Sequence, residues 1–155
     1  MILDKKRILV IDDDEHVRQS MARVLELEGY HVDTAKTGAE AVEKSKLNFY
    51  NLALIDIRLP DMEGTELLTA MRDTVPRMVK VMVTGYPSVK NAIDAVNKGA
   101  DGYVTKPITN IDTFLQKIKT HLKKQEESEQ YSEEKLADFV KTRIKKLENE
   151  KTDLK

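Results

Sequence analysis

Short apolar runs alternate with longer amphipathic segments through most of this chain. The apolar runs lie at residues 8–11, 31–35, 52–55, 79–83 and 102–105. Runs of this length that end at charged or turn-forming residues are typical of strands buried on both faces. Between them, apolar residues recur every three or four positions, which predicts helices that bury one side. The pattern therefore predicts an α/β fold, with a parallel sheet covered by helices on both faces.

The predicted strand order follows from the ways in which parallel strands can be connected. Right-handed crossovers leave few arrangements for five successive strand–helix units. We expect the doubly wound, flavodoxin-like order 2-1-3-4-5, a five-stranded sheet in which the first and third strands are neighbours. Ligands of such sheets bind beyond the carboxyl ends of the strands, where the order reverses. The residues that follow each strand are therefore the candidates for function.

Capping residues mark where the predicted helices begin and end. A threonine or serine can satisfy free amides at a helix start, often together with an acid three residues later. Glycine is favoured just past a helix end. The residues predicted in these roles are Thr37 with Glu40, Ser88, Thr109 with Asp112, Gly29 and Gly99.

Acidic residues follow two of the predicted strands immediately. Asp12 and Asp13 come directly after the first apolar run, and Asp56 comes directly after the third. Since an unpaired acid is costly inside an apolar strand, we expect all of them at the carboxyl ends, where neighbouring strands bring them together. Thr84 comes directly after the fourth run, and Lys106 comes directly after the fifth. Both would line the same edge. The sequence thus predicts a shared anionic pocket.

Other polar residues near this edge have simpler interpretations. Asp14 is expected to cap the helix that follows it. Asp61 and Glu63 are interpreted as solvated acids of the loop after the third strand. The histidines are interpreted as surface residues rather than metal ligands, namely His16, His31 and His121.

Composition narrows the class of protein. A chain of 155 residues fits one domain with an appendage, and a domain of this size can bury a core without disulfides or a structural metal. The absence of cysteine excludes thiol catalysis and cysteine–zinc sites, and fits a reducing, cytoplasmic environment. No apolar run approaches about 18 residues, so we expect no membrane insertion. The net charge of −1 gives no support to binding of nucleic acid or anionic lipid.

Four stretches carry a family resemblance. They read ILVIDDD at 8–14, LIDIRLPDMEG at 54–64, VTG at 83–85 and GYVTKP at 102–107. Together they resemble the receiver domain of two-component response regulators, of the kind found in chemotaxis response regulators (CheY-like). The resemblance covers about residues 5–122 in unbroken order and shows no departure at the phosphorylation positions.

The resemblance implies a role for each acid at the predicted sheet edge. Asp56 corresponds to the phosphoacceptor, and Asp13 to the main acid that binds Mg²⁺, with Asp12 in support. The backbone carbonyl of Arg58 would complete the protein's share of the metal shell. A hard dication suits this chemistry because it neutralises both the attacking carboxylate and the phosphoryl oxygens. Phosphoryl transfer relies chiefly on positioning and charge stabilisation, so no general base is needed.

The resemblance also implies how a signal would leave the site. Thr84 and Lys106 would bind the phosphoryl oxygens, and Tyr103 would be the aromatic switch. Phosphorylation adds close to two negative charges beside Thr84. The threonine would then turn inward and Tyr103 would rotate into the space it leaves, changing the face made by the fourth helix, fifth strand and fifth helix. The Lys106–Pro107 bond is expected to be cis.

The implied function is a phosphoacceptor switch in a two-component phosphorelay. A sensor histidine kinase would supply the phosphoryl group, and an unidentified output protein would bind the altered face. Such a chain catalyses its own phosphorylation and dephosphorylation but is not an enzyme for an external substrate. One alternative is a haloacid-dehalogenase-like phosphatase with Asp12 as nucleophile, although His16 stands where threonine or valine is expected. Another is the receiver part of a DNA-binding regulator whose effector domain is absent.

The highly charged C-terminal stretch requires a separate interpretation. We place the receiver domain at residues 5–124 and a charged amphipathic helical extension at 125–155. The apolar stripe of the last receiver helix stops at Leu122 and resumes only near Tyr131. Ser132, followed by two glutamates, predicts a new helix start.

Beyond Ser132 an apolar stripe returns on a charged background. Its members are Leu136, Phe139, Val140, Ile144, Leu147 and Leu154. An isolated amphipathic helix is poorly stable in water, so we expect residues 132–150 to be helical and to mediate a homodimer. Arg143 interrupts the heptad pattern, so a strict coiled coil is poorly supported. Docking back onto the receiver and connection to a missing effector remain open, and the basic run 141–146 is interpreted as a solvated helix face.

Overall fold

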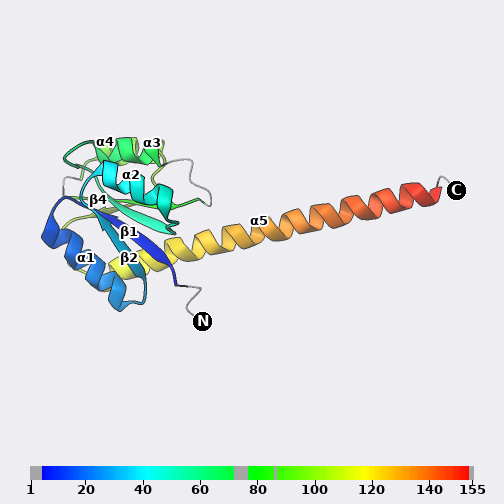
Figure 1. The fold of residues 1–155 in the computed structure, drawn as a ribbon, viewed down its shortest axis with the longest axis horizontal. Coiled ribbons are helices and arrows are strands. Elements are labelled where there is room, and N and C mark those ends of the chain that lie inside the picture. The colour runs from blue at the N-terminus through cyan, green and yellow to red at the C-terminus, as the bar shows by residue number, and fades with distance from the viewer. Residues whose placement is uncertain (1–4, 72–76, 86, 154–155) are drawn as a thin grey trace. The chain divides into compact units, whose positions relative to one another are not determined.

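Strands and helices alternate along the whole of the described chain (Figure 1). The computed structural model describes residues 5–71, 77–85 and 87–153, with side chains described throughout these ranges except at 129–136 and 151–153. The strands are β1 (Arg7–Ile11), β2 (His31–Ala35), β3 (Leu52–Asp56), β4 (Val79–Thr84) and β5 (Gly102–Thr105). The helices are α1 (Glu15–Leu27), α2 (Gly38–Leu47), α3 (Gly64–Ala70), α4 (Val89–Asn97) and α5 (Ile111–Asp153).

The strands form one parallel sheet in the predicted order, β2-β1-β3-β4-β5. Ile11 pairs with Ile55, so β1 and β3 end side by side, and Thr84 pairs with Thr105 at the ends of β4 and β5. Helices α2, α3 and α4 cover one face, whereas α1 and the start of α5 cover the other (Figure 1). The residues that follow β1, β3, β4 and β5 therefore gather along one edge.

The central strands are buried because helices cover the sheet on both sides. Leu9 and Ile11 of β1, Ile55 of β3 and Met82 of β4 have no exposed surface. Every residue of β4 is buried, including the polar Lys80. A parallel sheet covered in this way reads as nearly continuous apolar runs rather than an alternating pattern, which is what the sequence shows. The packed strands give the polar residues at their ends a rigid base.

Several helix ends lie where the sequence predicts them. The Asp14 side chain accepts hydrogen bonds from the amides of His16 and Val17 at the start of α1, and Ser88 caps α4. Gly29 and Gly99 follow α1 and α4 with φ of 97° and 105°, a backbone conformation that costs glycine little.

The start of α5 differs from the prediction. Asn110, rather than Thr109, caps the helix, and its side-chain oxygen accepts the amide of Thr113 at 3.0 Å. Asp112 lies in the first turn of the helix and does not complete a capping box with Thr109. Asparagine caps helices at least as well as threonine. The choice between two adjacent capping residues was therefore open in the sequence.

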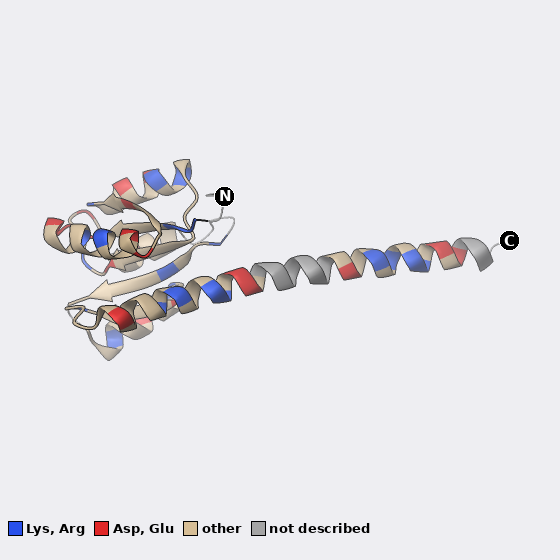
Figure 2. Cartoon of the chain, turned by 90° about the horizontal axis from the view of Figure 1, so that it is seen from below, with Lys and Arg blue, Asp and Glu red and all other residues tan. Residues whose placement is uncertain are grey.

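Helix α5 continues without a break through the charged stretch, so the prediction of a new helix start at Ser132 is wrong. The sequence contains neither proline nor glycine after residue 107, and nothing in the polar segment stops the helix. The chain forms two compact units, residues 1–118 and 119–155. Figure 2 shows both signs of charge along α5 in the second unit.

The second unit carries an exposed apolar stripe. Phe139, Val140, Ile144 and Leu147 are 64%, 46%, 51% and 52% exposed. The other predicted members of the stripe lie outside the described side chains, namely Tyr131, Leu136 and Leu154. Over the described residues, no helix combines the length and the apolar character needed to cross a membrane.

Candidate functional site

Three carboxylates meet at the carboxyl edge of the sheet. Asp12 and Asp13 follow β1, and Asp56 is the last residue of the neighbouring strand β3. One oxygen from each lies within 4.8 Å of the others. Asp12 is buried, Asp56 is half-buried and Asp13 is exposed, so the cluster opens to solvent through Asp13. The structure thus brings together the acids that the sequence placed at this edge.

Lys106 supplies the positive charge beside these acids. Its Nζ lies 2.6 Å from Oδ2 of Asp12 and 3.5 Å from Oδ2 of Asp56. The backbone positions it, because its amide donates to the carbonyl oxygen of Thr84 at 2.7 Å. The bond from Lys106 to Pro107 is cis, as expected. Lys106 therefore bridges two carboxylates and favours Asp12.

Groups from several segments hold Asp12, and the sequence analysis missed one of them, the side chain of Arg18. Its Oδ1 accepts the amide of Asp14 at 2.9 Å, its Oδ2 accepts Lys106, and its backbone carbonyl accepts Nη1 of Arg18 at 2.9 Å. Arg18 is only 7% exposed. It lies one turn before Met21 on the buried side of α1. This helical spacing from a buried methionine could have indicated that Arg18 is buried as well. With both oxygens engaged, Asp12 is poorly placed to act as the nucleophile of a phosphatase.

The crowding of acids changes the ionisation of the site. Burial raises the pKa of the Asp56 carboxyl above its usual value, and the nearby charge of Asp12 raises it further, whereas Lys106 acts in the opposite direction. Burial alone would lower the pKa of Lys106, but its hydrogen bond to Asp12 and the charge of both acids raise it overall. One ammonium group therefore does not fully compensate the buried negative charge.

Thr84 and Tyr103 lie on the neighbouring strands β4 and β5. Thr84 ends β4 and has no exposed surface. Tyr103 packs against the main apolar core, and its hydroxyl oxygen is buried without a hydrogen-bond partner. An unsatisfied buried hydroxyl costs about 1–3 kcal/mol, so this position of the ring carries a penalty. Thr84 thus ends the strand next to β3, whereas Tyr103 lies one strand further out and pairs with Met82.

The loop between β3 and α3 lies against Asp56. The amide of Arg58 points to Oδ1 of Asp56 at 3.4 Å, and Arg58 forms an antiparallel bridge with Glu63. A Cβ added to Gly64 would lie 2.2 Å from the carbonyl oxygen of Asp56, so only glycine fits there. Asp61 is exposed, as expected of a solvated loop acid, but its carboxylate also accepts two backbone amides of α2, which the sequence analysis did not predict.

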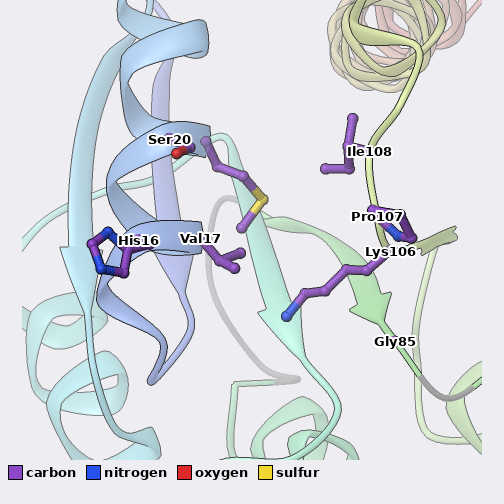
Figure 3. A pocket seen from close by; sticks show the side chains of 8 residues that line it. His16, Val17, Ser20, Gly85, Lys106, Pro107 and Ile108 are labelled. Carbon is purple, nitrogen blue, oxygen red and sulfur yellow. The ribbon is translucent and has the colours of Figure 1, made fainter.

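A hollow of about 540 Å³ opens beside Lys106. Figure 3 shows Val17 of α1 and Ile108 on opposite sides of it, with the Lys106 side chain extending between them. His16 also lines the hollow and is exposed, as the sequence analysis expected of a surface histidine. The lining is mainly apolar, so a partner could pack close to the acid cluster.

The donor set at this edge suits a magnesium ion. Mg²⁺ is a hard cation that prefers oxygen ligands and usually keeps several waters. Asp12, Asp13 and Asp56 offer three carboxylates within bonding reach of one ion. Burial and the charge of Asp12 raise the pKa of Asp56, and a dication would favour its ionised form. The residues present therefore fit Mg²⁺, whose role when bound is to neutralise charge on the acids and on an incoming phosphoryl group.

Comparison with known proteins agrees with this geometry. The family profile of the response regulator receiver domain matches residues 8–119. The cell cycle response regulator CtrA of Brucella ovis is 31% identical over 121 residues, which cover 74% of this chain and 52% of that protein. The chain therefore spans about half the length of the curated relatives it matches.

Solved structures show the same fold. A CheY-like receiver domain protein from Methanospirillum hungatei is 48% identical, covers 81% of this chain and 99% of its own, and superposes with a TM-score of 0.76. The beryllofluoride-activated NtrC4 receiver domain, solved as a dimer, is 37% identical with a TM-score of 0.72, covering 77% of this chain and 98% of its own. The fold, the acid cluster and the family profile agree, and this chain belongs to the response regulator receiver domains of two-component signalling.

Proposed function

We propose that this chain is a Mg²⁺-dependent phosphoacceptor switch in which Asp56 receives a phosphoryl group from a sensor histidine kinase. The observation that carries the proposal is the cluster of three acids served by one lysine at the carboxyl edge of the sheet. Receiver domains are generally signalling switches rather than enzymes, and no substrate of turnover is proposed. We place the exchange in the cytoplasm, in keeping with a chain that has no cysteine.

The proposed transfer uses Asp56 as the nucleophile. A carboxylate oxygen of Asp56 forms a bond to phosphorus as the phosphorus–nitrogen bond of a phosphohistidine breaks, and the imidazole keeps the electron pair and takes up a proton. The product is an acyl phosphate, a covalent intermediate known for carboxylate nucleophiles. Asp12 and Asp13 would hold Mg²⁺ together with Asp56, and the carbonyl of Arg58 would complete the protein ligands. No general base is required, because positioning and charge stabilisation dominate phosphoryl transfer.

Lys106 and Thr84 would bind the transferred group. Lys106 already lies 3.5 Å from Asp56 and needs to give up only its contact with Asp12. Asp12 would need that ammonium group less if it helped to hold Mg²⁺, and Lys106 would then be available for a phosphoryl oxygen. Thr84 ends the adjacent strand and can donate its hydroxyl to another oxygen.

Tyr103 would transmit the change to an output partner. Its buried hydroxyl has no partner, so the present ring position is energetically unfavourable and a small shift at Thr84 can change it. Val89, Ile93 and Val96 of α4 are 77%, 56% and 66% exposed on one side of the neighbouring helix. An exposed apolar stripe of this kind is typical of a protein interface. We propose that the output partner binds the face made by α4, β5 and α5.

The hollow between α1 and the segment after β5 is the proposed approach for the phosphodonor. Its apolar lining at Val17, Met21 and Ile108 can pack against a helix, while Lys106 marks the side nearest the acids. A donor histidine seated there would lie beside Lys106, whose ammonium group contacts Asp56.

Intact-mass spectrometry tests the proposal. Acetyl phosphate with Mg²⁺ should add one phosphoryl group to the wild-type chain and none to Asp56→Asn. Asp33→Asn is the matched control, because it neutralises an acid of the same sheet that lies in the middle of β2 and outside the acid cluster. Labelling of Asp56→Asn at the wild-type level would contradict the assignment.

We also propose a homodimer through residues 132–150. The observation in its favour is the exposed stripe of Phe139, Val140, Ile144 and Leu147 on an otherwise charged helix. Burying each large apolar side chain contributes roughly 1.5–3 kcal/mol before entropic costs, so a second copy of the stripe would stabilise the helix.

Analytical ultracentrifugation tests the dimer. The full chain and the variant Asn149→Asp should sediment as dimers, whereas Leu147→Asp and a chain ending at Lys124 should be monomers. Asn149→Asp introduces the same charge two residues away from Leu147 but off the stripe. Monomers throughout at tens of micromolar would contradict the dimer and favour docking back onto the receiver or a link to an effector.

A further inference from the structure

Asp61 lies in the loop between β3 and α3 and contacts the start of α2. Its Oδ1 accepts the amide of Gly38 and its Oδ2 accepts the amide of Ala39, both at 2.9 Å. These two bonds join segments that are 22 and 23 residues apart in the sequence. The hydrogen bonds from Ala39 and Gly38 lower the pKa of the Asp61 carboxyl below its usual value, which shows that both bonds favour the ionised form.

Helix α2 depends on Asp61 for two of its free amides. The remaining amides of its first turn are satisfied locally, since that of Glu40 donates to the Thr37 hydroxyl and that of Ala41 to the Thr37 carbonyl. The Glu40 carboxylate accepts the amide of Lys36 rather than completing the predicted exchange with Thr37. The first four amides of a helix have no partner within the helix, so a carboxylate from another loop completes the set here.

Close packing leaves the tip of this loop little freedom. A Cβ added to Gly38 would lie 2.4 Å from the sulfur of Met62, so the loop sits directly on the start of α2. Within the loop, the amide of Leu59 donates to the carbonyl of Met62 at 3.1 Å, and that of Gly64 donates to Ile57 at 2.7 Å. The loop is therefore a small hairpin with its tip held to α2.

The same hairpin leads directly to the acid cluster. Arg58 lies two residues after Asp56 and directs its amide to Oδ1 of Asp56 at 3.4 Å. A shift of the hairpin tip would change where Arg58 presents its amide and its carbonyl. The contacts thus run from α2 through Asp61 and the hairpin to Asp56.

We infer that Asp61 is a positioning residue of the metal site, which fixes the hairpin so that Asp56 and the Arg58 carbonyl meet a bound Mg²⁺. This role rests on the proposed function, because it requires the acid cluster to hold the metal. Residues that orient metal ligands typically contribute about 10- to 100-fold to metal affinity. Because Asp61 acts through the backbone of the hairpin, we expect a loss of roughly tenfold, the lower end of that range.

The test is a Mg²⁺ titration followed by amide NMR shifts on the full chain, which has no tryptophan for a fluorescence titration. The variants are Asp61→Ala, which removes both acceptors, and Asp61→Asn, which keeps the shape and one acceptor oxygen. Glu63→Gln is the matched control. It removes the same charge from the same loop, and Glu63 makes no side-chain capping bond to α3.

Asp61→Ala should weaken Mg²⁺ binding about tenfold and speed hydrogen exchange at the Gly38 and Ala39 amides, with Asp61→Asn in between. Glu63→Gln should stay within roughly twofold of wild type, because an exposed charge acts only through screened, long-range attraction. Equal losses in Asp61→Ala and Glu63→Gln, or no loss in Asp61→Ala, would overturn the role of Asp61 while leaving the metal site in place. A wild-type chain that shows no Mg²⁺-dependent shifts would overturn the proposed function and this role together.

Discussion

Two acids of the same sheet have contrasting surroundings. Asp33 lies in the middle of β2, but its partners lie at the amino ends of β1 and β3. It accepts the hydroxyl of Tyr50 at 2.6 Å and an Arg7 nitrogen at 3.4 Å, and the Arg7 guanidinium also lies over the Tyr50 ring. At the carboxyl ends, Asp56 shares one ammonium group, from Lys106, with a second carboxylate. Asp33 thus has a cation and a hydroxyl donor beside it, whereas Asp56 shares its cation with Asp12.

The pKa values of the two acids move in opposite directions for this reason. Burial alone would raise the pKa of Asp33, but the hydrogen bond from Tyr50 and the cations nearby lower it overall. Burial and a neighbouring acid raise the pKa of Asp56. An acid whose charge is satisfied contributes to stability, whereas an acid held in excess negative charge is ready to bind a cation or an electrophile. The group around Asp33, whose partners lie at the amino ends, therefore stabilises the fold, whereas the acid cluster around Asp56 at the carboxyl ends is suited to chemistry.

Losing a metal ligand should give the largest effect. Asp13→Ala is expected to slow phosphorylation by acetyl phosphate on the order of 100-fold or more at fixed Mg²⁺, because a direct ligand matters at least as much as the residues that orient ligands. Asp33→Asn should leave the rate unchanged. Time courses of intact mass measure both. Comparable slowing of phosphorylation in Asp13→Ala and Asp33→Asn would contradict the claim that only the carboxyl-end acids take part in the chemistry.

The hydroxyl of Tyr50 should matter for stability and not for phosphorylation. Tyr50→Phe removes the bond to the ionised Asp33 and is expected to lower the free energy of unfolding by about 2 kcal/mol, the usual range for a hydrogen bond to a charged group. Urea unfolding gives the stability, and the mass assay gives the labelling. A fully stable Tyr50→Phe variant would mean that the amino edge is not held by this bond.

Neutralising Asp56 should stabilise the chain when Mg²⁺ is absent. Asp56→Asn is expected to raise the free energy of unfolding by on the order of 1 kcal/mol at about pH 7, because it removes a charge beside Asp12. A raised pKa means that the folded chain holds this proton more tightly than the unfolded chain does. The resulting stabilisation is present below the unfolded pKa and is lost as the pH rises through the folded pKa.

The advantage of Asp56→Asn should therefore shrink as the pH falls through the raised pKa of the wild-type carboxyl, which becomes protonated. Urea unfolding at several pH values measures it. An advantage that does not change with pH would contradict the raised pKa of Asp56.

Tyr103→Phe should give the smallest effect and the opposite sign to Tyr50→Phe. The Tyr103 hydroxyl is buried without a partner, so its removal is expected to raise the free energy of unfolding by about 1 kcal/mol, the lower end of the cost of an unsatisfied buried group. Urea unfolding of the two tyrosine variants side by side makes the comparison direct. A loss of stability in Tyr103→Phe would mean that its hydroxyl finds a partner in solution.

The strands and the acid cluster were predictable from the sequence because both depend on local patterns. A buried strand ends where its apolar run ends, and the parallel order then fixes which ends are neighbours. Asp12, Asp13 and Asp56 follow from these two facts alone, and the wound order of the sheet adds Thr84 and Lys106.

The contacts that the sequence did not reveal join segments far apart in the chain. In the sequence, Asp61 resembles any other loop acid, and its contact with the start of α2 depends on the fold. Arg18 likewise resembles a surface residue, and its bond to the carbonyl of Asp12 is evident only in the structure. The continuity of α5 was missed for a different reason. Ser132 is a good capping residue, but a helix already under way has no free amide there for it to satisfy.

The most direct test of the account is to locate the phosphoryl group within the chain. The wild-type chain is phosphorylated with acetyl phosphate and Mg²⁺, the acyl phosphate is reduced with borohydride, and the modified residue is identified by tandem mass spectrometry of its peptides. The account predicts that Asp56 alone is converted, and that chelation of Mg²⁺ prevents the conversion. Modification of Asp12 or Asp13 in place of Asp56, or labelling that persists without the metal, would contradict it.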